Sequence, residues 1–441
     1  MVSFYTPGPR QAQRTFELCC SELDLRCRGV GRSGGKVWFC EGLLPGEMAE
    51  VRPGSSRSAE AVLVRRLNDS AQRREPDCPQ QHFCGGCPLQ YIPPELALES
   101  KCAGIRRLFK RSCGVDLGES AFVVHSPEYG YRRACRLSAR RDHGRMHLGF
   151  REGKSHKLAE FTTCPVLTPR LQALLLPLGQ LVNQLEARFN LGHAELLDSD
   201  DQAALNLRFG CQLDEADCCK LKEFAASYEC LVTLTETLQA GGNETLERLI
   251  AGEPECCVVH SGGLGLCCLP SDFVQINQQA GPELTARVLE ALQGAPGRRI
   301  LDLYCGLGYF TLPLAAAGAQ VCGVDIVRAM IKRAQENAAR LGLGSAEFIC
   351  ADLAVPFSEQ DFAKKDYDAV LLDPGRSGAA EAAAYILERK IRRVVLVSCN
   401  PRAAARDSAL WFHAGWRVRS WGVFDMFPRT SHIEMLLNLE L

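Results

Sequence analysis

The stretch LDLYCGLGYF, residues 301–310, predicts an apolar strand, a Gly-x-Gly turn and the start of a helix near Phe310. Glycines at 306 and 308 let the backbone approach a ligand closely. The next predicted strand ends in Asp325, where a carboxylate can accept hydrogen bonds from both ribose hydroxyls. The third glycine of the dinucleotide-binding fingerprint is absent, so the pattern favours an adenosyl ligand without a pyrophosphate, such as S-adenosylmethionine.

The C-terminal part of the chain continues this alternation of strands and helices. Strand candidates from residue 271 onward are RRILDLYC, AQVCGVD, AEFICAD, YDAVLLD, RRVVLVSC, WRVRSWGVFD and EMLLNLEL. Helical stretches separate most of them, a pattern typical of a doubly wound α/β fold with a mostly parallel sheet. We therefore predict a Rossmann-like domain over residues 271–441.

Reactive side chains follow several of these strands. Asp352 ends the strand that comes after Asp325, and LLDPGRSG places Asp373 and Arg376 at the tip of another strand. Cys399 lies in a turn before Asn and Pro, whereas a structural thiol would more naturally lie within an apolar run. Because ligands of open α/β sheets bind at the carboxyl ends of the strands, these side chains should converge on one crevice. For Arg376, a surface ion pair is the alternative.

The N-terminal part predicts a different architecture. KVWFC and AVLVRRL, separated by glycine- and proline-rich turns, have the β-branched and aromatic content of strands. They favour a small β-barrel of the oligonucleotide-binding type within residues 1–77, with a purely structural barrel as the alternative. Residues 78–270 contain a cysteine-rich loop, a predicted helix from Pro94 to Lys110 and mixed helical and strand signals, so we predict a mixed α/β central domain there.

The composition describes a multi-domain globular protein. The chain has 441 residues, 46% of them hydrophobic, and a formal net charge of −1. This average hides a segregation, because residues 101–157 contain 14 basic and 5 acidic side chains. Such a block suits a polyanion such as nucleic acid, and a solvated face is an equal alternative on charge alone. The sequence has neither the apolar core of a signal peptide nor a run of 18 apolar residues, so we expect a cytoplasmic location and no membrane partner.

Cysteines are unusually frequent, at 23 in the chain. In a reducing compartment they cannot form a disulfide framework, and most of them are expected to pack as small hydrophobic residues. Cys78, Cys84 and Cys87, together with the distant Cys164, supply four thiolates that suit either tetrahedral zinc or an iron–sulfur cluster. The spacing alone does not decide between these metals.

Six ordered motifs resemble the RNA uracil-5-methyltransferases that use S-adenosylmethionine. The motifs are FVQIN (273–277), LDLYCGLGYFTLPLA (301–315), QENA (335–338), LLDPGRSGA (371–379), SCNPRAAARD (398–407) and FDMFPRTSHIEMLLNLEL (424–441). The resemblance implies a class I methyltransferase domain preceded by a TRAM domain over about residues 15–75. It also implies that the Cys399 thiolate adds to carbon 6 of uracil and that Glu434 later removes the proton from carbon 5.

The same resemblance implies further sites. The cofactor residues would be Gln275, Tyr304, Asp325, Asp352 and Asp373. The motif CGGCPLQ and the later Cys-Pro imply a [4Fe-4S] cluster bound by Cys78, Cys84, Cys87 and Cys164, with Cys102 and Cys113 as weaker alternatives for the fourth ligand.

The combination of TRAM domain, cluster and length implies 23S ribosomal RNA as substrate. Relatives that modify tRNA lack the cluster, and shorter relatives that modify rRNA lack the TRAM domain. A methyltransferase for tRNA or for another rRNA uracil, and a non-catalytic RNA-binding iron–sulfur protein, are the alternatives. We expect a monomer.

Three positions depart from the family pattern. Gly375 replaces a usual second proline, Tyr309 a usual asparagine, and Asp325 the more common glutamate. None of these changes removes a reacting group.

Overall fold

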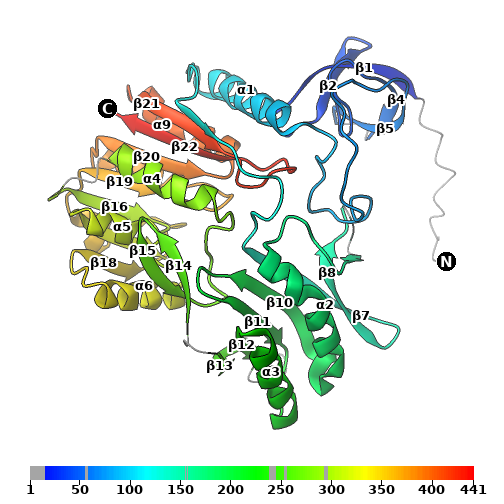
Figure 1. Ribbon diagram of the computed structural model, residues 1–441. Coiled ribbons are helices and arrows are strands. Elements are labelled where there is room, and N and C mark those ends of the chain that lie inside the picture. Colours follow the sequence, from blue (N-terminus) through cyan, green and yellow to red (C-terminus); the bar gives the residue numbers. More distant parts are fainter. Residues whose placement is uncertain are drawn as a thin grey trace, which may run out of the picture. The chain divides into compact units, whose positions relative to one another are not determined.

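The computed structural model describes residues 15–54, 58–153, 155, 157–237, 245–252, 256–292 and 296–441 (Figure 1). The chain divides into two compact units. The first contains the described residues up to Asp77 together with Pro88–Arg107 and Arg429–Ser431, and the second contains Cys78–Cys87, Leu108–Pro428 and His432–Leu441. None of the helices in the described ranges combines the length and the apolar character that crossing a bilayer requires.

The first unit contains a closed five-stranded barrel with the order β1-β2-β3-β5-β4, drawn in blue in Figure 1. Its strands are β1 (Phe16–Leu23), β2 (Gly29–Ser33), β3 (Lys36–Cys40), β4 (Met48–Pro53) and β5 (Glu60–Arg66). Leu18, Ala49 and Val51 are fully buried inside it. Glycine allows β2 to approach β1, because a Cβ atom at Gly31 would lie 2.3 Å from the carbonyl oxygen of Cys19. The predicted β-barrel is confirmed.

A buried ion pair fixes the chain that leaves the barrel. The carboxylate of Glu47 accepts hydrogen bonds from Nε and Nη2 of Arg73, at 2.6 and 2.7 Å, and from the backbone N–H of Leu44 at 2.8 Å. Burial opposes the charge on Glu47, but these hydrogen bonds outweigh it and hold the pKa of Glu47 below its ordinary value. The unit also includes the first part of helix α1 (Pro94–Cys113), whose Gly104 lies against the backbone of Leu25.

The second unit contains a seven-stranded sheet with the order β13-β12-β11-β10-β7-β8-β9. Its strands are β7 (Ala134–Asp142), β8 (Arg145–Arg151), β9 (Leu158–Glu160), β10 (Leu191–Asp198), β11 (Ala203–Phe209), β12 (Cys230–Thr237) and β13 (Thr245–Ala251). Helices α2 (Pro169–Gln184) and α3 (Glu215–Tyr228) lie along one face, and the 3-10 helix η1 (Glu186–Asn190) precedes β10. Leu178, Leu205 and Leu221 belong to the core between the helices and this face. The predicted mixed α/β architecture is confirmed.

An eight-stranded sheet contains the strands predicted from residue 271 onward, in the order β18-β17-β16-β19-β20-β22-β21-β6. The strands are β6 (Phe122–Val124), β16 (Arg299–Leu303), β17 (Gln320–Asp325), β18 (Ala346–Cys350), β19 (Ala369–Leu372), β20 (Arg393–Ser398), β21 (Arg417–Phe424) and β22 (Glu434–Glu440). Strands β16 to β20 pair in parallel, whereas β22 runs antiparallel to β20 and β21. The predicted doubly wound, mostly parallel sheet is confirmed. Strand β6 adds an edge strand that precedes residue 271.

Helices and one hairpin complete this part of the unit. The helices are α4 (Ala280–Leu292), α5 (Thr311–Ala316), α6 (Arg328–Arg340), α7 (Asp361–Lys364), α8 (Ala380–Glu388) and α9 (Pro401–His413). Leu284 of α4 and Ile331 of α6 share a buried core with Ile300 and Val395 of the sheet. The hairpin formed by β14 (Cys257–Ser261) and β15 (Leu264–Cys268) contributes Val259 to the same core.

Candidate active site

The candidate site lies where the strand order of the eight-stranded sheet reverses, between β16 and β19. Ligands of open α/β sheets bind at this position, outside the carboxyl ends of the strands. Tyr304, Asp373 and Cys399 directly follow β16, β19 and β20, and Asp325 is the last residue of β17. Glu434 is the first residue of the antiparallel β22, so it belongs to the same edge of the sheet.

The glycine turn after β16 is held by the acid at the end of β17. Oδ2 of Asp325 accepts the N–H of Gly306 at 3.1 Å, and Oδ1 accepts the N–H of Val327 at 2.8 Å. Gly306 and Gly308 have φ of 56° and 87°, which glycine adopts without strain. Tyr304 has φ of 69°, an uncommon backbone conformation for a side-chain-bearing residue that often occurs at functional sites.

Asp302 is a buried acid that the sequence analysis did not select. Burial raises its pKa to about 7, and the charges of Asp373 and Asp325 raise it as well. Oδ2 accepts the hydroxyl of Thr311, whereas the buried Oδ1 has no hydrogen-bond partner among the described residues. An unpaired buried acceptor beside a glycine turn is suited to a polar group of a ligand. An acid within the otherwise apolar run LDLYC was the available sequence signal.

Cys399 and Glu434 lie together with two further charged groups. Ser398 and Met435 are direct partners in the antiparallel ladder, so the next positions along the two strands, 399 and 434, lie opposite each other. Burial, and to a smaller extent Glu434 and Asp373, raise the pKa of Cys399 to about 11, while Arg376 lowers it. Burial and the neighbouring Asp373 hold the pKa of Glu434 well above its ordinary value. The arrangement therefore combines a thiol, a cation that favours its thiolate, and two carboxyl groups that favour sharing a proton.

The loop that carries Arg376 is fixed by side chains of α9 and of the turn before it. Nδ2 of Asn400 donates to the carbonyl oxygen of Arg376 at 2.8 Å. Asp407 is buried, and its Oδ2 accepts the N–H of Ala379 at 2.7 Å. A Cβ atom at Gly378 would lie 2.4 Å from the same oxygen. Asp407 belongs to the motif SCNPRAAARD, but no local pattern in the sequence marks it as a residue that holds this loop.

The motif FVQIN forms a turn before α4, and its asparagine joins several segments. Asn277 is buried, and its Oδ1 accepts the N–H of Ala280, at the start of α4. Its Nδ2 donates to the carbonyl oxygen of Met426 at 3.1 Å and to Oγ of Ser126 at 3.0 Å. Asn277 thus ties the turn of Gln275 to the loop that leads toward Glu434.

A short segment, Tyr131–Arg133, connects this turn to the loop after Cys164. On one side the N–H of Arg133 donates to the carbonyl oxygen of Ile276 and the N–H of Gln278 to that of Tyr131. On the other side the N–H of Arg132 donates to the carbonyl oxygen of Val166. The segment therefore binds both loops through backbone hydrogen bonds.

The other predicted cofactor residues have different surroundings. Asp352 is exposed, and its Oδ1 accepts the N–H of Ala354 at 2.8 Å. Its charge raises the pKa of Tyr304, for which burial is the main cause. Gln275 and the hydroxyl of Tyr309 both lie against Gly281, since a Cβ there would be 3.2 Å from Cβ of Gln275 and 3.1 Å from that hydroxyl.

The thiols of Cys78, Cys84 and Cys164 are close enough to Cys87 to influence its ionisation. Burial is the main cause that raises the pKa of Cys87 to about 12, and Cys164, Cys84 and Cys78 raise it further while Arg132 lowers it. The N–H of Gly86 donates to Sγ of Cys84 at 3.3 Å. Four soft thiol donors with a nearby cation and an amide donor are chemically suited to an iron–sulfur cluster.

The side chains of the described residues do not form a ready-made metal site. In the described ranges, no group of three or more His, Cys, Asp or Glu side chains is arranged to hold a metal ion. The two weaker ligand candidates have other surroundings, because Cys102 is a buried residue of the first unit and Sγ of Cys113 donates to the carbonyl oxygen of Ala405 at 3.1 Å.

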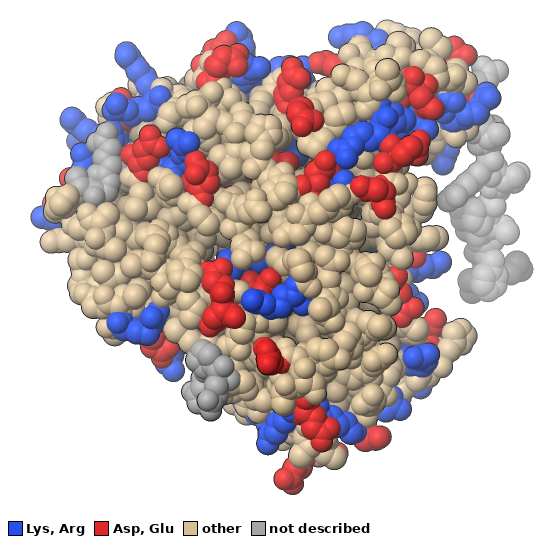
Figure 2. Space-filling view, in the orientation of Figure 1, with Lys and Arg blue, Asp and Glu red and all other residues tan. Residues whose placement is uncertain are grey.

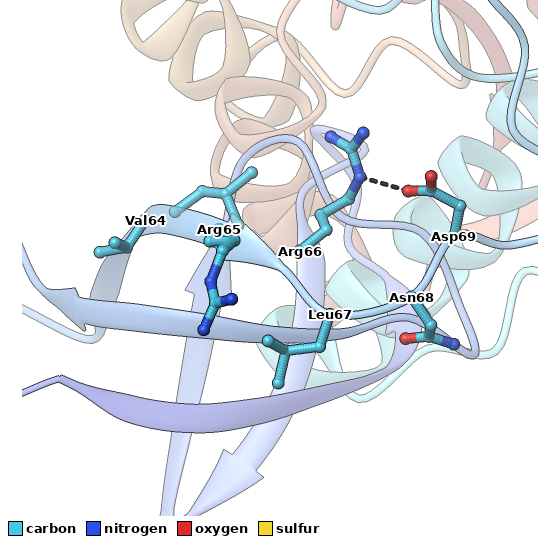
Figure 3. A pocket seen from close by; sticks show the side chains of 7 residues that line it. Val64, Arg65, Arg66, Leu67, Asn68 and Asp69 are labelled. Atoms are coloured by element: carbon cyan, nitrogen blue, oxygen red, sulfur yellow. Dashed lines mark hydrogen bonds and ion pairs between the residues drawn. The ribbon is translucent and has the colours of Figure 1, made fainter.

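Charge is distributed unevenly but without one dominant patch on the face shown in Figure 2. There, basic and acidic side chains lie intermixed, with wide areas that carry neither. A hollow on the barrel is lined by residues 63–69 (Figure 3), and in it Nε of Arg66 is paired with Asp69 at 2.6 Å. This hollow contains no thiol or histidine and belongs to the first unit, whereas Cys399 and Glu434 belong to the second.

Comparisons with known proteins agree with the motifs. Residues 268–440 match the family model described as tRNA (uracil-5-)-methyltransferase. Proteins named 23S rRNA (uracil(1939)-C(5))-methyltransferase RlmD are similar over the whole chain. The relative from Photorhabdus laumondii is 38% identical over 99% of both chains, and that from Tolumonas auensis is 37% identical over 100% of both.

A solved structure shares the fold. It is the Pyrococcus abyssi tRNA (uracil-54, C5)-methyltransferase in complex with S-adenosyl-L-homocysteine, with a TM-score of 0.72 and 22% identity. The match covers 96% of this chain and 100% of that one. The class I methyltransferase fold expected from the motifs is thereby confirmed.

Proposed function

Because the chain belongs to the RNA uracil-5-methyltransferase family, we propose that it forms 5-methyluridine at a specific uracil of 23S ribosomal RNA. The observation that carries the proposal is the placement of Cys399 opposite Glu434 at the carboxyl edge of a methyltransferase sheet. S-adenosylmethionine, when bound, supplies an electrophilic methyl group. The residues proposed to hold it are Gln275, Tyr304, Asp325, Asp352 and Asp373, and the unpaired Oδ1 of the buried Asp302 fits a polar group of such a ligand.

Cys399 is the proposed nucleophile. Carbon 5 of uracil is a weak nucleophile, and addition of a thiolate to carbon 6 raises its electron density so that it can accept the methyl group. The pKa of about 11 means that the thiol predominates at neutral pH, and the nearby Arg376 favours the small thiolate fraction. Arg376 is also suited to offset negative charge that develops on the uracil ring during the addition.

Glu434 is the proposed base. After methyl transfer, carbon 5 still carries its proton, and Cys399 can leave carbon 6 only when that proton is removed. A carboxylate whose pKa is raised by burial and by Asp373 is a stronger base than an exposed one. Asp373 is suited to stabilise the protonated form of Glu434 by accepting its hydrogen bond.

We further propose that Cys78, Cys84, Cys87 and Cys164 bind a [4Fe-4S] cluster. The mutual pKa effects of these thiols support their proximity, and four thiolates are the usual ligands of such a cluster. Methyl transfer requires no electron, so the cluster is assigned to structure or to RNA folding.

The choice of substrate rests on the full-length relatives, which are named for 23S rRNA. The barrel and the basic residues 101–157 would bind the RNA backbone with a salt-dependent affinity, and the target base must leave its stack to reach Cys399. We propose a cytoplasmic monomer, because ribosomal RNA is the substrate and all proposed reacting groups belong to one chain. A tRNA substrate is the second candidate, because the family model and the solved relative are named for tRNA.

The test is transfer of a labelled methyl group from S-adenosylmethionine to unmodified 23S rRNA and to tRNA. The proposal predicts incorporation into 23S rRNA by the wild-type protein and none by Cys399→Ala. Incorporation into tRNA alone would identify tRNA, and not 23S rRNA, as the substrate. Equal incorporation by the variant and the wild type would reject Cys399 as the nucleophile.

A further inference from the structure

We propose that Phe83 is a stacking platform for an unpaired nucleobase, and that exposed arginines of the neighbouring strands β7 and β8 bind the phosphates of that single-stranded segment. The inference rests on the proposed function, because it concerns the RNA that the enzyme modifies. Phe83 precedes the first cysteine of the CGGC motif, and 59% of its surface is exposed, an unusual state for so large an apolar side chain.

The backbone of Phe83 is fixed against β8. The N–H of Gly85 donates to the carbonyl oxygen of Arg151 at 3.1 Å, and the N–H of Gly153 donates to that of Phe83 at 3.3 Å. These bonds make Cys84 and Glu152 an antiparallel bridge. The tight fit also requires glycine, since a Cβ atom at Gly85 would lie 2.9 Å from the backbone of Gly153.

Strand geometry then assigns the two faces. Bridge partners point to the same face, so Cys84 shares the face of Glu152. Phe83 lies just before this bridge in a turn, where the N–H groups of Phe83 and Cys84 both donate to the carbonyl oxygen of Gln80. The face of Cys84 also carries Met146 and Phe150, which pack on the core beneath α2. The ring of Phe83 is exposed and is therefore not part of this packed face.

The opposite, outer face of β8, beside whose end the backbone of Phe83 is bonded, is basic. Alternation along β8 places Arg145, His147 and Arg151 on it, and the pairing of Arg140 with His147 adds Arg140 from β7. All three arginines are exposed, and none of them forms an ion pair with another side chain in the part of the chain that the structure describes. His147, by contrast, is paired with Glu160.

An exposed aromatic ring beside exposed arginines fits single-stranded RNA. Every nucleobase has a face that can stack on an aromatic ring, and the phosphates of the same strand require cations nearby. A duplex would not offer a free base, so the segment recognised is unpaired. Hydrophobic shielding of the cysteine loop is the competing role for Phe83, although the exposure of its ring argues against it.

The experiment uses the full-length protein purified without oxygen, and a fluorescein-labelled single-stranded RNA whose binding is followed by anisotropy. Phe83→Ala should weaken binding about tenfold, and Phe83→Trp should restore it. The matched control is Tyr228→Ala, which removes an exposed ring from α3 on the other side of the sheet. Phe83→Ala should leave the salt dependence unchanged, whereas Arg145→Gln should lower the slope of log K against log salt by about 0.7.

Equal affinity of Phe83→Ala and wild type would overturn the proposal. The variant could instead lose the visible absorption of the proposed cluster faster in air while its RNA affinity stays unchanged. That result would likewise overturn the proposal and show that Phe83 shields the cysteine loop. Methyl transfer by the wild-type protein, measured in parallel, separates the two proposals. An inactive wild type rejects the proposed function, whereas an active wild type with an unaffected Phe83→Ala variant rejects only the stacking role.

Discussion

Cys399 and Glu434 occupy opposite positions on neighbouring antiparallel strands, one step beyond the ladder pair Ser398 and Met435. The thiol and the carboxyl group are therefore held by the backbone of the sheet rather than by flexible loops. A nucleophile and a base that act on adjacent carbon atoms of one ring require this kind of fixed separation.

The charges around Cys399 should control its reactivity in the free protein. Its alkylation by iodoacetamide is expected to accelerate as the pH rises toward about 11, because the thiolate is the reacting form. Between pH 8 and 10, Glu434→Gln should react several-fold faster than wild type and Arg376→Gln several-fold slower, since the carboxylate raises the pKa and the guanidinium lowers it. Peptide mapping by mass spectrometry measures the rates, and an identical rate in all three proteins would contradict the electrostatic assignment.

Replacement of Glu434 should trap the reaction after methyl transfer. In Glu434→Gln the proton on carbon 5 has no base, so Cys399 stays bonded to carbon 6 and a protein–RNA adduct accumulates. A slowly migrating band on a denaturing gel detects the adduct, and the double variant with Cys399→Ala serves as its control. If no band formed with Glu434→Gln, another residue would have to be the base.

The loop that carries Arg376 offers a matched pair of glycine variants. Gly378→Ala should reduce kcat more than tenfold, because its φ is 83° and the new Cβ would clash with Asp407. Gly375→Ala should retain activity, since a Cβ atom at Gly375 would meet no other atom of the described residues within 4 Å. Steady-state methyl transfer compares the two variants, and equal losses would show that the fit at Gly378 is unimportant.

Iron content should depend on the four proposed ligands alone. Cys87→Ser is expected to lose the iron and the broad visible absorption near ~400 nm of protein purified without oxygen. Cys113→Ser should retain both, because its thiol binds the carbonyl oxygen of Ala405 instead. Stoichiometric zinc in place of iron, measured by elemental analysis, would exclude the cluster.

Barrel stability should depend on Glu47. Glu47→Gln is expected to lower the free energy of unfolding of the first unit by about 3 kcal/mol, because Arg73 would stay buried without its partner. In the wild type this contribution is complete above the unfolded-state pKa of about 4.3 and is lost as the pH falls through the lower pKa of the folded state. Hydrogen exchange of barrel peptides reports the change.

The matched control for Glu47 is Glu50→Gln, three residues further along the chain in β4. Glu50 is paired with an Arg65 side chain that is 69% exposed. Solvent therefore screens this ion pair, and water can take over its hydrogen bonds when the pair is removed. The exchange of barrel peptides in Glu50→Gln should therefore match that of the wild type. Equal acceleration in both variants would show that burial of the Glu47 pair adds nothing to barrel stability.

The strand-end residues were predictable because parallel sheets follow a simple rule. Apolar runs ending in Asp325, Asp373 and Cys399 place those residues at one edge regardless of loop detail. The role of Glu434 was predicted only through the resemblance. The pairing of β22 beside β20, which brings Glu434 opposite Cys399, was not predicted, because the strands can be recognised in the sequence but their order cannot.

Other parts depended on contacts between distant segments. Strand β6 has three residues and no periodicity of its own, and its place is fixed by pairing with β21. Asn277 and Asp407 act through buried hydrogen bonds to segments far along the chain, which no local pattern reveals. Asp302 differs from these two residues, because an acid within an apolar strand can be recognised in the sequence.

The segment Tyr131–Arg133 has a thermodynamic consequence. Its backbone is bonded on one side to the loop after Cys164 and on the other to the turn of Gln275, so both loops depend on the same three residues. The amides of Arg132, Arg133 and Gln278 should therefore exchange with solvent in one cooperative opening. A substitution that loosens the loop after Cys164 should therefore also raise the opening frequency of the turn that contains Gln275.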